Sequence, residues 1–361
     1  MFSVVILGCQ YNYHDAKNIT HQLKKMGYIY TTNTKCADII IILSCAVRQK
    51  PMDRIFGKIN EFKKNNKNII IVLAGCVLDK DKKRLSKKVD LITNIDNFQQ
   101  DISKIIKTNN IKTINKKINI STIDFFPKNE VENSVYVPII QGCNNFCTYC
   151  AVPYTRGREI SQSPNKIIAN IKLALKNNKK HMILLGQNVN SYKYLSGNSN
   201  SIIDFTKLLK TIDNINNNFT YNFISPNPRN FPIQLSNFLT ISKKWNKHLH
   251  LPLQSANDDI LKKMNRGYNK SQYLRIVQNL KSKIKNLNLT TDIIVGFPGE
   301  KDKHFADTYQ ICKSLKFTHA YISQYSPREG TFAKKNYEDD VPRSVKYKRW
   351  QILNELINKK N

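Results

Sequence analysis

The sequence contains no hydrophobic run long enough to cross a membrane. Its longest apolar stretches, "ADIIIILSCA" and "NIIIVLAGC", have the length of a buried strand, whereas a membrane-spanning helix needs about 20 residues. The start, "MFSVVILGCQYNYHD", lacks the basic segment and the small-residue cleavage site of a secretory signal. We therefore expect a cytoplasmic protein with no membrane partner, whose thiols stay reduced.

Acidic residues are scarce. The 361 residues include 58 Lys and Arg but only 26 Asp and Glu, which gives a formal net charge of +32. Such an excess favours a polyanionic partner, and nucleic acid comes first. Lys, Asn and Ile are used heavily throughout the chain, however, so a general compositional bias explains the charge equally well. The length predicts two or three domains.

Apolar strands alternate with helical patterns along the whole chain, which predicts an α/β protein. In the N-terminal part the strand-like runs are continuous, as expected for an open parallel sheet covered by helices on both faces. From residue 134 onwards, six further strands alternate with helices and predict a partial (β/α)6 barrel. The predicted divisions are an N-terminal domain at 1–107, a linker at 108–133 and a barrel domain at 134–361.

Three cysteines follow three of the N-terminal strand-like runs directly. They are Cys9, Cys45 and Cys76. Because ligands bind at the carboxyl ends of strands in open α/β sheets, we expect these thiols to meet at one edge of the sheet. The alternative is that each thiol is a small buried hydrophobic group, as free cysteines often are.

Three more cysteines, Cys143, Cys147 and Cys150, have the spacing C-x3-C-x2-C after the first barrel strand. A four-iron cluster normally takes four thiolates, so three leave one iron open to a small molecule. Zinc is the alternative, but no fourth Cys or His follows at finger spacing. Spacing and the aromatic Tyr149 resemble the motif of radical S-adenosylmethionine enzymes.

Further motifs extend this resemblance to the whole chain. "LGCQYNYHDA", "LSCAVRQKPMDRIFG" and "AGCV" resemble the N-terminal domain of the methylthiotransferases, and "GCNNFCTYCAVPYTRGREIS", "ILLGQNVNSY", "HLPLQSANDDILKKMNRGY", "DIIVGFPGE" and "YSPREGTFA" resemble their radical domain. "VPYTRG" and "LLGQNVNSY" favour the branch that makes 2-methylthio-N6-dimethylallyladenosine in tRNA. The alternatives are the threonylcarbamoyl-adenosine branch, the ribosomal-protein branch, and a non-catalytic cluster-bearing RNA-binding protein.

The resemblance implies two [4Fe–4S] clusters, one on each set of three cysteines, and S-adenosylmethionine as cofactor. It also implies that the cofactor contacts Tyr149, Gln254, Gly296 and Phe297. The turn "VGFPGE" has a second interpretation as a simple strand-to-helix turn that uses glycine for its backbone freedom. The reaction adds a methylthio group to C2 of an adenine at position 37, and an electron donor such as flavodoxin or ferredoxin is implied.

The expected partner is the anticodon loop of tRNA, whose bases can be unstacked and held against aromatic side chains. Tyr154 and Arg156 follow the cluster motif and are candidates for that contact, although ordinary loop packing explains them equally well. We expect a monomer. Members of this family usually continue into a small C-terminal barrel, the TRAM domain, which we expect to be lacking here; positive charge would then hold tRNA through counterion release.

The remaining reactive side chains are interpreted as structural. Cys36 and Cys312 match no pattern, and His248 and His250 alternate along a strand as packing or supporting groups. Among the departures from the family, Ser44 stands where Asn is common. Because all six cluster cysteines are present, we expect an active enzyme.

Overall fold

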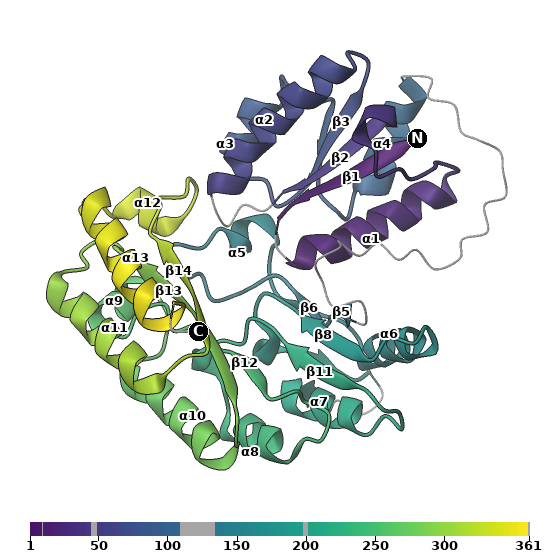
Figure 1. The fold of residues 1–361 in the computed structure, drawn as a ribbon. Helices are drawn as coiled ribbons and strands as arrows, with labels where there is room; N and C mark the ends of the chain where they lie inside the picture. Colours follow the sequence, from purple (N-terminus) through teal and green to yellow (C-terminus); the bar gives the residue numbers. More distant parts are fainter. Residues whose placement is uncertain (9, 45–48, 109–133, 198–200, 360–361) are drawn as a thin grey trace. The chain divides into compact units, whose positions relative to one another are not determined.

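The computed structural model describes residues 1–8, 10–44, 49–108, 134–197 and 201–359 (Figure 1). These residues form two compact units. The first unit contains the described residues before 131 together with 328–330, and the second unit contains the others. The predicted linker lies outside the described residues except for Thr108. No helix in the described part of the chain is long and apolar enough to span a bilayer.

The first unit is a four-stranded parallel sheet with helices between the strands (Figure 1). Every residue of its second strand is buried, as expected for a sheet covered on both faces. Neighbouring strands pair in the order β1, β2, β3, β4. The elements are β1 (Phe2–Leu7), α1 (Gln10–Lys25), η1 (Thr34–Cys36), β2 (Ile39–Ser44), α2 (Gln49–Asn65), β3 (Ile70–Gly75), α3 (Asp79–Leu85), β4 (Leu91–Thr93) and α4 (Phe98–Thr108).

The side of the sheet on which the chain adds its next strand changes between β1 and β2. After α1 it pairs with the free side of β1, where Tyr30 forms a parallel bridge with Phe2. It then returns to form β2 on the other side of β1. Accordingly, Ile19 of α1 and Ile55 of α2 lie in separate core clusters on opposite faces of the sheet. Such a topological switch point is where open α/β sheets bind ligands.

One helix begins earlier than its sequence pattern predicts. The apolar spacing within residues 15–27 predicts a helix that begins at Asp15, whereas α1 spans Gln10–Lys25. Its first turns bury polar side chains, Asn12 and Asp15, which are 0% and 2% exposed. Because the hydrophobic period counts only apolar residues, it misses a turn whose buried face is polar.

The second unit confirms the predicted parallel strands of the partial barrel. Its six barrel strands form two three-stranded parallel sheets, ordered β11-β8-β5 and β12-β13-β14. The two sheets are joined just before β12, where Tyr221 of β11 forms a parallel bridge with Trp245. The strands are β5 (Ser134–Pro138), β8 (His181–Leu185), β11 (Thr220–Phe223), β12 (His248–His250), β13 (Asn288–Val295) and β14 (His319–Gln324).

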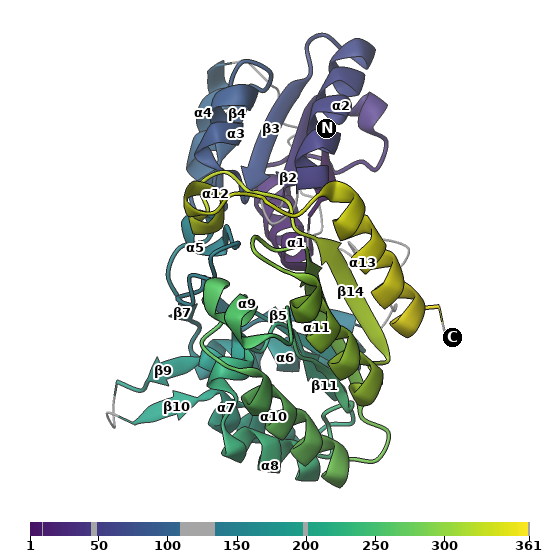
Figure 2. The ribbon, with the colours of Figure 1, turned by 90° about the vertical axis from the view of Figure 1, so that its left-hand side faces the viewer.

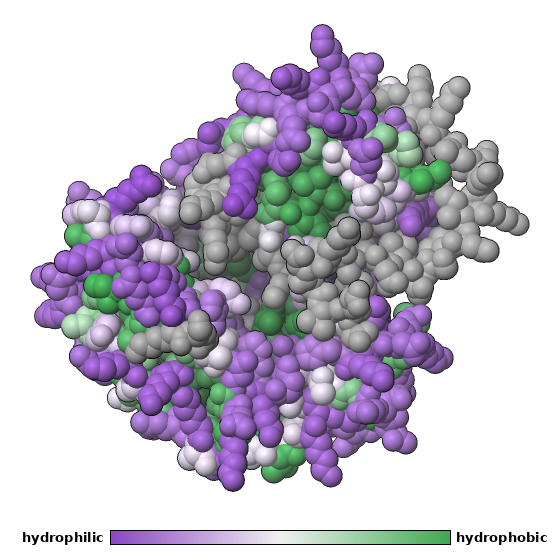
Figure 3. All heavy atoms as spheres, in the orientation of Figure 1, coloured by the Kyte–Doolittle hydropathy of each residue, from purple (hydrophilic) through white to green (hydrophobic). Residues whose placement is uncertain are grey.

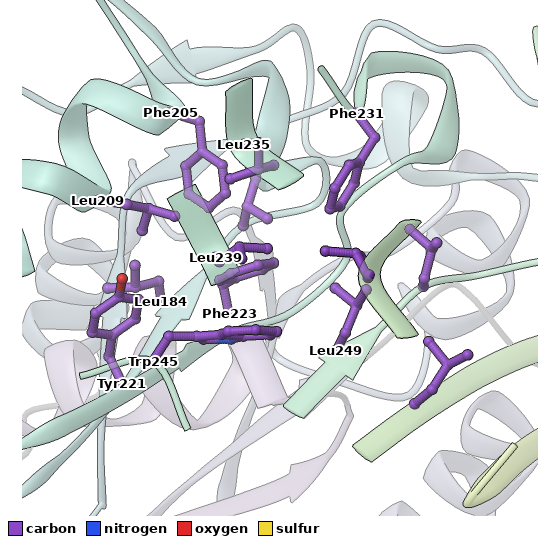
Figure 4. Packing of buried hydrophobic residues seen from close by; sticks show 14 of the residues in the cluster. Leu184, Phe205, Leu209, Tyr221, Phe223, Phe231, Leu235, Leu239, Trp245 and Leu249 are labelled. Atoms are coloured by element: carbon purple, nitrogen blue, oxygen red, sulfur yellow. The ribbon is translucent and has the colours of Figure 1, made fainter. Parts of the chain in front are cut away.

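Helices cover the outer face of these strands (Figures 1 and 2). Alternate strand residues point outward into one large apolar cluster, in which Phe223 stacks on Trp245 at 6.2 Å between ring centroids (Figure 4). The helices are α5 (Val152–Thr155), α6 (Pro164–Lys176), α7 (Phe205–Asp213), α8 (Ile233–Ile241), α9 (Asp258–Lys263), α10 (Lys270–Lys283), α11 (Asp302–Leu315), α12 (Phe332–Asn336) and α13 (Arg343–Ile357).

Short elements complete the second unit and shape its loops. They are β6 (Ile140–Gln141), β7 (Ile160–Ser161), η2 (Val189–Ser191), β9 (Lys193–Leu195), β10 (Ile202–Asp204) and η3 (Pro228–Asn230). β6 and β7 pair antiparallel, and Gln141 lies opposite Ile160. This small ribbon holds the two ends of the loop that carries Cys143, Cys147 and Cys150.

Candidate functional site

The C-x3-C-x2-C cysteines lie in one loop between β6 and α5. Cys143 and Cys147 are buried, and Cys150 is half-buried. Burial raises the pKa of Cys143 to about 11 and that of Cys150 to about 12, and in both cases the neighbouring Cys147 adds to the rise. The three side chains are therefore close enough to interact electrostatically. In the metal-free protein the Cys143 and Cys150 thiols hold their protons at neutral pH, and metal binding must displace them.

The loop begins at a glycine, and any other residue there would force the neighbouring backbone to move. Gly142 has φ +79°, and a Cβ there would lie 2.0 Å from the carbonyl oxygen of Arg158. The backbone N–H of Gly142 donates to Oε1 of Gln187 at 2.7 Å, and the N–H of Cys143 donates to the carbonyl of Gly157 at 3.2 Å. Backbone contacts thus fix Cys143 against the strand-like segment that precedes β7.

The end of α9 and the residues after it support the rest of the loop. The Thr148 hydroxyl donates to the carbonyl of Lys263 at 2.9 Å, and the Thr148 N–H donates to the carbonyl of Met264 at 3.0 Å. The Asn265 side-chain amide donates to the carbonyls of Asn145 and Phe146 at 3.2 and 3.1 Å. The loop around the thiols is therefore held from both sides.

Arg266 brings a buried positive charge to the thiols, and sequence analysis did not single it out. Its side chain is 6% exposed, and Nη1 lies 3.1 Å from Sγ of Cys147 and 3.4 Å from the hydroxyl of Tyr149. Its Nε donates to the hydroxyl of Tyr268 at 3.3 Å, which in turn donates to the carbonyl of Leu253 at 2.6 Å. A buried guanidinium is costly unless negative groups face it, as thiolates would here. The only sequence signal for this role is that Arg266 lies within the family-like motif "KKMNRGY".

Tyr149 and Phe297, both predicted cofactor contacts, lie together beside the thiol loop. Their rings contact edge to face with centroids 6.5 Å apart, and both belong to one small apolar cluster with Ile294. Gln254 has φ +64° and is 8% exposed, and its carbonyl accepts from the N–H of Ile294 at 2.9 Å. The structure therefore brings three predicted residues to the carboxyl ends of β12 and β13.

Gly296, the fourth predicted contact, sits in a turn that α13 holds in place. It has φ +69°, and its N–H donates to Oε2 of Glu300 at 2.5 Å. The same carboxylate accepts from Nη1 of Arg349 at 2.8 Å, and both charged residues are buried. Burial raises the pKa of Glu300, while these two donors favour its ionised form. The arrangement fixes the turn where β13 ends.

In the first unit, Cys76 is the described member of the second cysteine set, and it is packed where the strands of the sheet end. Cys76 is 5% exposed; its N–H donates to the carbonyl of Ser44, and the Ser44 hydroxyl donates to the carbonyl of Cys76, both at 3.2 Å. Asn12 lies against the glycines that end β1 and β3, since a Cβ on Gly8 would be 1.9 Å from its Oδ1 and one on Gly75 would be 3.2 Å from its Nδ2. Cys9 and Cys45 lie outside the described residues.

Tyr154 and Arg156 follow the thiol loop closely, and the remaining candidates lie elsewhere in the fold. The Tyr154 side chain is 53% exposed, and Arg156 is half-buried at the end of α5. Figure 3 shows hydrophilic residues over most of the visible face, in keeping with the net charge of +32. Cys36 is exposed and Cys312 is buried in the large apolar cluster. His250 Nε2 lies 3.0 Å from Oδ2 of Asp292, within the barrel wall.

The donor set fits an iron–sulfur cluster in which one iron has no protein ligand. Among the described residues, no three His, Cys, Asp or Glu side chains converge closely enough to hold one ion. Thiolates that bind different irons of a [4Fe–4S] cluster need no common point. The loop also provides only three thiols, with Arg266 beside them, which suits an anionic cluster with one iron open to a ligand.

The raised thiol pKa values predict slow alkylation of the metal-free protein. At pH 8 a thiol with a pKa of about 11 is about one-thousandth ionised, and only the thiolate reacts. Iodoacetamide should therefore label the buried Cys143 and the half-buried Cys150 at least roughly tenfold more slowly than the exposed Cys36, although a thiolate of higher pKa is intrinsically more nucleophilic. The slow rates should rise about tenfold per pH unit up to the pKa. Peptide mass spectrometry measures all three sites at once, and equal rates would contradict the burial.

The sequence matches two known protein families along most of its length. The Radical SAM superfamily matches residues 137–312, and Uncharacterized protein family UPF0004 matches residues 1–95. A tRNA-2-methylthio-N(6)-dimethylallyladenosine synthase of Clostridium botulinum (strain Hall) is 39% identical over 100% of this chain and 83% of its own length. A protein of the same name from Thermoanaerobacter sp. (strain X514) is 38% identical over 99% of this chain and 78% of its own.

Solved structures with low sequence identity share the fold. The radical S-adenosylmethionine methyltransferase TsrM from Kitasatospora setae, with cobalamin and a [4Fe-4S] cluster bound, has a TM-score of 0.62 at 10% identity, over 92% of this chain and 76% of its own. The cobalamin-dependent S-adenosylmethionine radical enzyme OxsB has a TM-score of 0.57 at 14% identity, over 99% of this chain and 55% of its own. The α/β prediction is confirmed.

Proposed function

Because the chain belongs to the family of the tRNA-2-methylthio-N(6)-dimethylallyladenosine synthases, within the radical SAM superfamily, we propose that it is a tRNA methylthiotransferase. It adds a methylthio group to C2 of N6-dimethylallyladenosine at position 37. The observation that carries the assignment is the loop in which Cys143, Cys147 and Cys150 come together beside the buried Arg266. Three thiolates with one open coordination position are what the first step of such a reaction needs.

Cys143, Cys147 and Cys150 would hold one [4Fe–4S] cluster. When bound, this group supplies the electron that splits S-adenosylmethionine into methionine and a 5′-deoxyadenosyl radical, which takes the hydrogen atom from C2. A radical suits this position because the proton of an unactivated aromatic C–H bond is not acidic enough for a general base to remove. The chain's own part is to bind and orient the reactants and to exclude water around them.

Several side chains support that part. Arg266 offsets the negative charge of the cysteine thiolates, because its Nη1 reaches Sγ of Cys147 at 3.1 Å. The edge-to-face rings of Tyr149 and Phe297 provide an apolar wall beside the loop. Gln254 and Gly296, at the ends of β12 and β13, offer polar groups to the cofactor.

Cys9, Cys45 and Cys76 would hold a second cluster, which supplies the sulfur that becomes the methylthio group. Cys76 supports this proposal, since it directly follows β3 at the carboxyl end of the sheet, where open α/β sheets bind ligands. The tRNA anticodon loop is the proposed partner, with flavodoxin or ferredoxin as electron donor. A tRNA substrate would place the enzyme in the cytoplasm, where we propose that it acts as a monomer.

Nucleoside analysis tests this proposal. Protein reconstituted without oxygen is incubated with S-adenosylmethionine, dithionite and tRNA that carries N6-dimethylallyladenosine, and the digested tRNA is analysed by mass spectrometry. We expect 2-methylthio-N6-dimethylallyladenosine, and no product on the matched tRNA with unmodified adenosine. Product only on threonylcarbamoyl-adenosine tRNA, or only on a ribosomal protein, would contradict the proposed branch.

A further inference from the structure

The loop that carries the cysteines also displays a small stack of flat side chains. The Arg158 guanidinium lies over the ring of Phe146 at 4.4 Å, and the ring of Tyr154 meets Phe146 edge to face at 5.9 Å between centroids. We call these three residues the arginine–aromatic stack. Phe146 directly precedes Cys147, so the stack lies one residue from a cluster cysteine. Its members come from the loop itself, from α5 and from the segment before β7.

The stack is held rigidly at two points. Phe146 has φ +46°, a left-handed conformation that costs a non-glycine residue roughly 1–2 kcal/mol. Asn265 offsets this by donating to the Phe146 carbonyl at 3.1 Å. Arg158 is fixed through its backbone, which packs so closely on Gly142 that no side chain fits between them. Strained backbone that the surroundings hold in place is found preferentially at ligand sites.

Core packing does not account for this arrangement. Within the described residues, neither Phe146 nor Tyr154 belongs to a hydrophobic core cluster. Tyr154 is 53% exposed, and Arg158 is exposed as well. A rigid, solvent-facing pair of ring and guanidinium planes gains its full contact area only when another flat group covers it.

The chemistry of the stack favours a nucleobase next to a phosphate. Guanidinium and aromatic planes are the surfaces on which unpaired RNA bases stack. The carboxylate next to Arg158 in the sequence, Glu159, accepts from the N–H of Asn144 at 3.2 Å and from the Asn188 amide at 3.0 Å. Glu159 thus bonds to Asn144 and Asn188, while the Arg158 guanidinium lies on the ring of Phe146.

We propose that the arginine–aromatic stack binds the RNA base that neighbours the target adenine, and so keeps the target unstacked for reaction. This rests on the proposed function in taking tRNA as the substrate. Each side chain has one role: Phe146 and Tyr154 provide ring surfaces, and Arg158 provides a planar cation that both stacks and contacts phosphate. Arg158 and Phe146 are positioning residues for the substrate, because they hold a base that does not react.

Fluorescence of 2-aminopurine tests the proposal in the reconstituted holoenzyme. Two anticodon stem-loop RNAs carry this base directly before or directly after the target adenine, and stacking quenches its emission. We expect wild-type protein to quench one of the two. Arg158→Lys keeps the charge but loses the plane, so it should lose the quenching and weaken binding about five- to a hundredfold with an unchanged salt slope. Arg158→Ala should also reduce the salt slope by about one.

Matched controls lie on α13, where Tyr347 is 50% exposed and Arg343 is exposed. Tyr347→Leu and Arg343→Lys should bind and quench like wild type, whereas Tyr154→Leu should quench less. Iron content checks that each variant keeps its clusters. RNA binding without quenching at either position, or wild-type quenching by Arg158→Lys, would overturn the proposal. Quenching that depends on the stack in a protein that forms no methylthio product would instead refute the proposed function alone.

Discussion

Replacing Cys147 with serine is expected to abolish methylthio transfer, by at least about 10³-fold, because the proposed reaction starts at the cluster that this thiolate would hold. The side chain is 8% exposed and accepts the contact of Arg266, so its loss removes one thiolate and leaves that buried cation without its sulfur contact. Iron bound per reconstituted chain should fall from about eight to about four. Nucleoside analysis and iron determination on the same preparation give both results.

Cys312→Ala is the matched control for this variant. Cys312 is also buried, at 2% exposure, but it lies on α11 within the apolar cluster. Burial raises its pKa to about 12, much as for the cluster thiols, so burial alone does not separate the two kinds of cysteine. The control should keep its full iron content and its activity. Loss of iron in Cys312→Ala, or retained activity in Cys147→Ser, would contradict the assignment.

The second large effect is expected for Gly142→Ala. The left-handed backbone costs alanine roughly 1–2 kcal/mol, and the new methyl group would lie 2.0 Å from the backbone oxygen of Arg158. We expect the free energy of unfolding of the second unit to fall by roughly 3 kcal/mol or more, which lowers its Tm by roughly 6 to 12 °C. The strain is at the start of the cluster loop, so cluster loading should fall too.

Gly157→Ala separates the two causes of that effect. Gly157 has a similar φ of +75°, but a Cβ there would meet nothing within 4 Å. It should lose only the conformational part, about 1 kcal/mol, or roughly 2 to 4 °C in Tm. Calorimetry of the metal-free proteins measures both variants. Equal shifts for the two would mean that the close approach of Gly142 to Arg158 is not a constraint on the loop.

Periodicity and spacing were sufficient for the fold and for the cysteine loop. Continuous apolar runs such as β2 can be buried only in a covered parallel sheet, so the architecture followed from them. The early start of α1 was missed because Asn12 and Asp15 are polar, and no hydrophobic period registers a polar buried face. The bridge of Tyr30 with Phe2, which creates the switch point, is a single contact and leaves no pattern in the sequence.

The sequence alone could not predict which side chains pair with one another across the loops. Arg266 follows Cys147 by more than a hundred residues, and its contact with the thiol depends on how α9 ends beside the loop. The pairing of Arg349 with Glu300 likewise joins two distant segments. Phe146 was not singled out, because its place in the arginine–aromatic stack depends on a backbone angle and on Arg158.

Iron and sulfide content after anaerobic reconstitution tests the central claim most directly. Two sets of three cysteines predict about eight irons and about eight sulfides per chain, as two four-iron clusters. A Cys76→Ala variant should retain about four of each, on the loop of Cys143, Cys147 and Cys150. About four irons in the wild-type protein, unchanged by Cys76→Ala, would contradict the account, since the first unit would then hold no cluster and the methylthiotransferase reaction would lack its sulfur site.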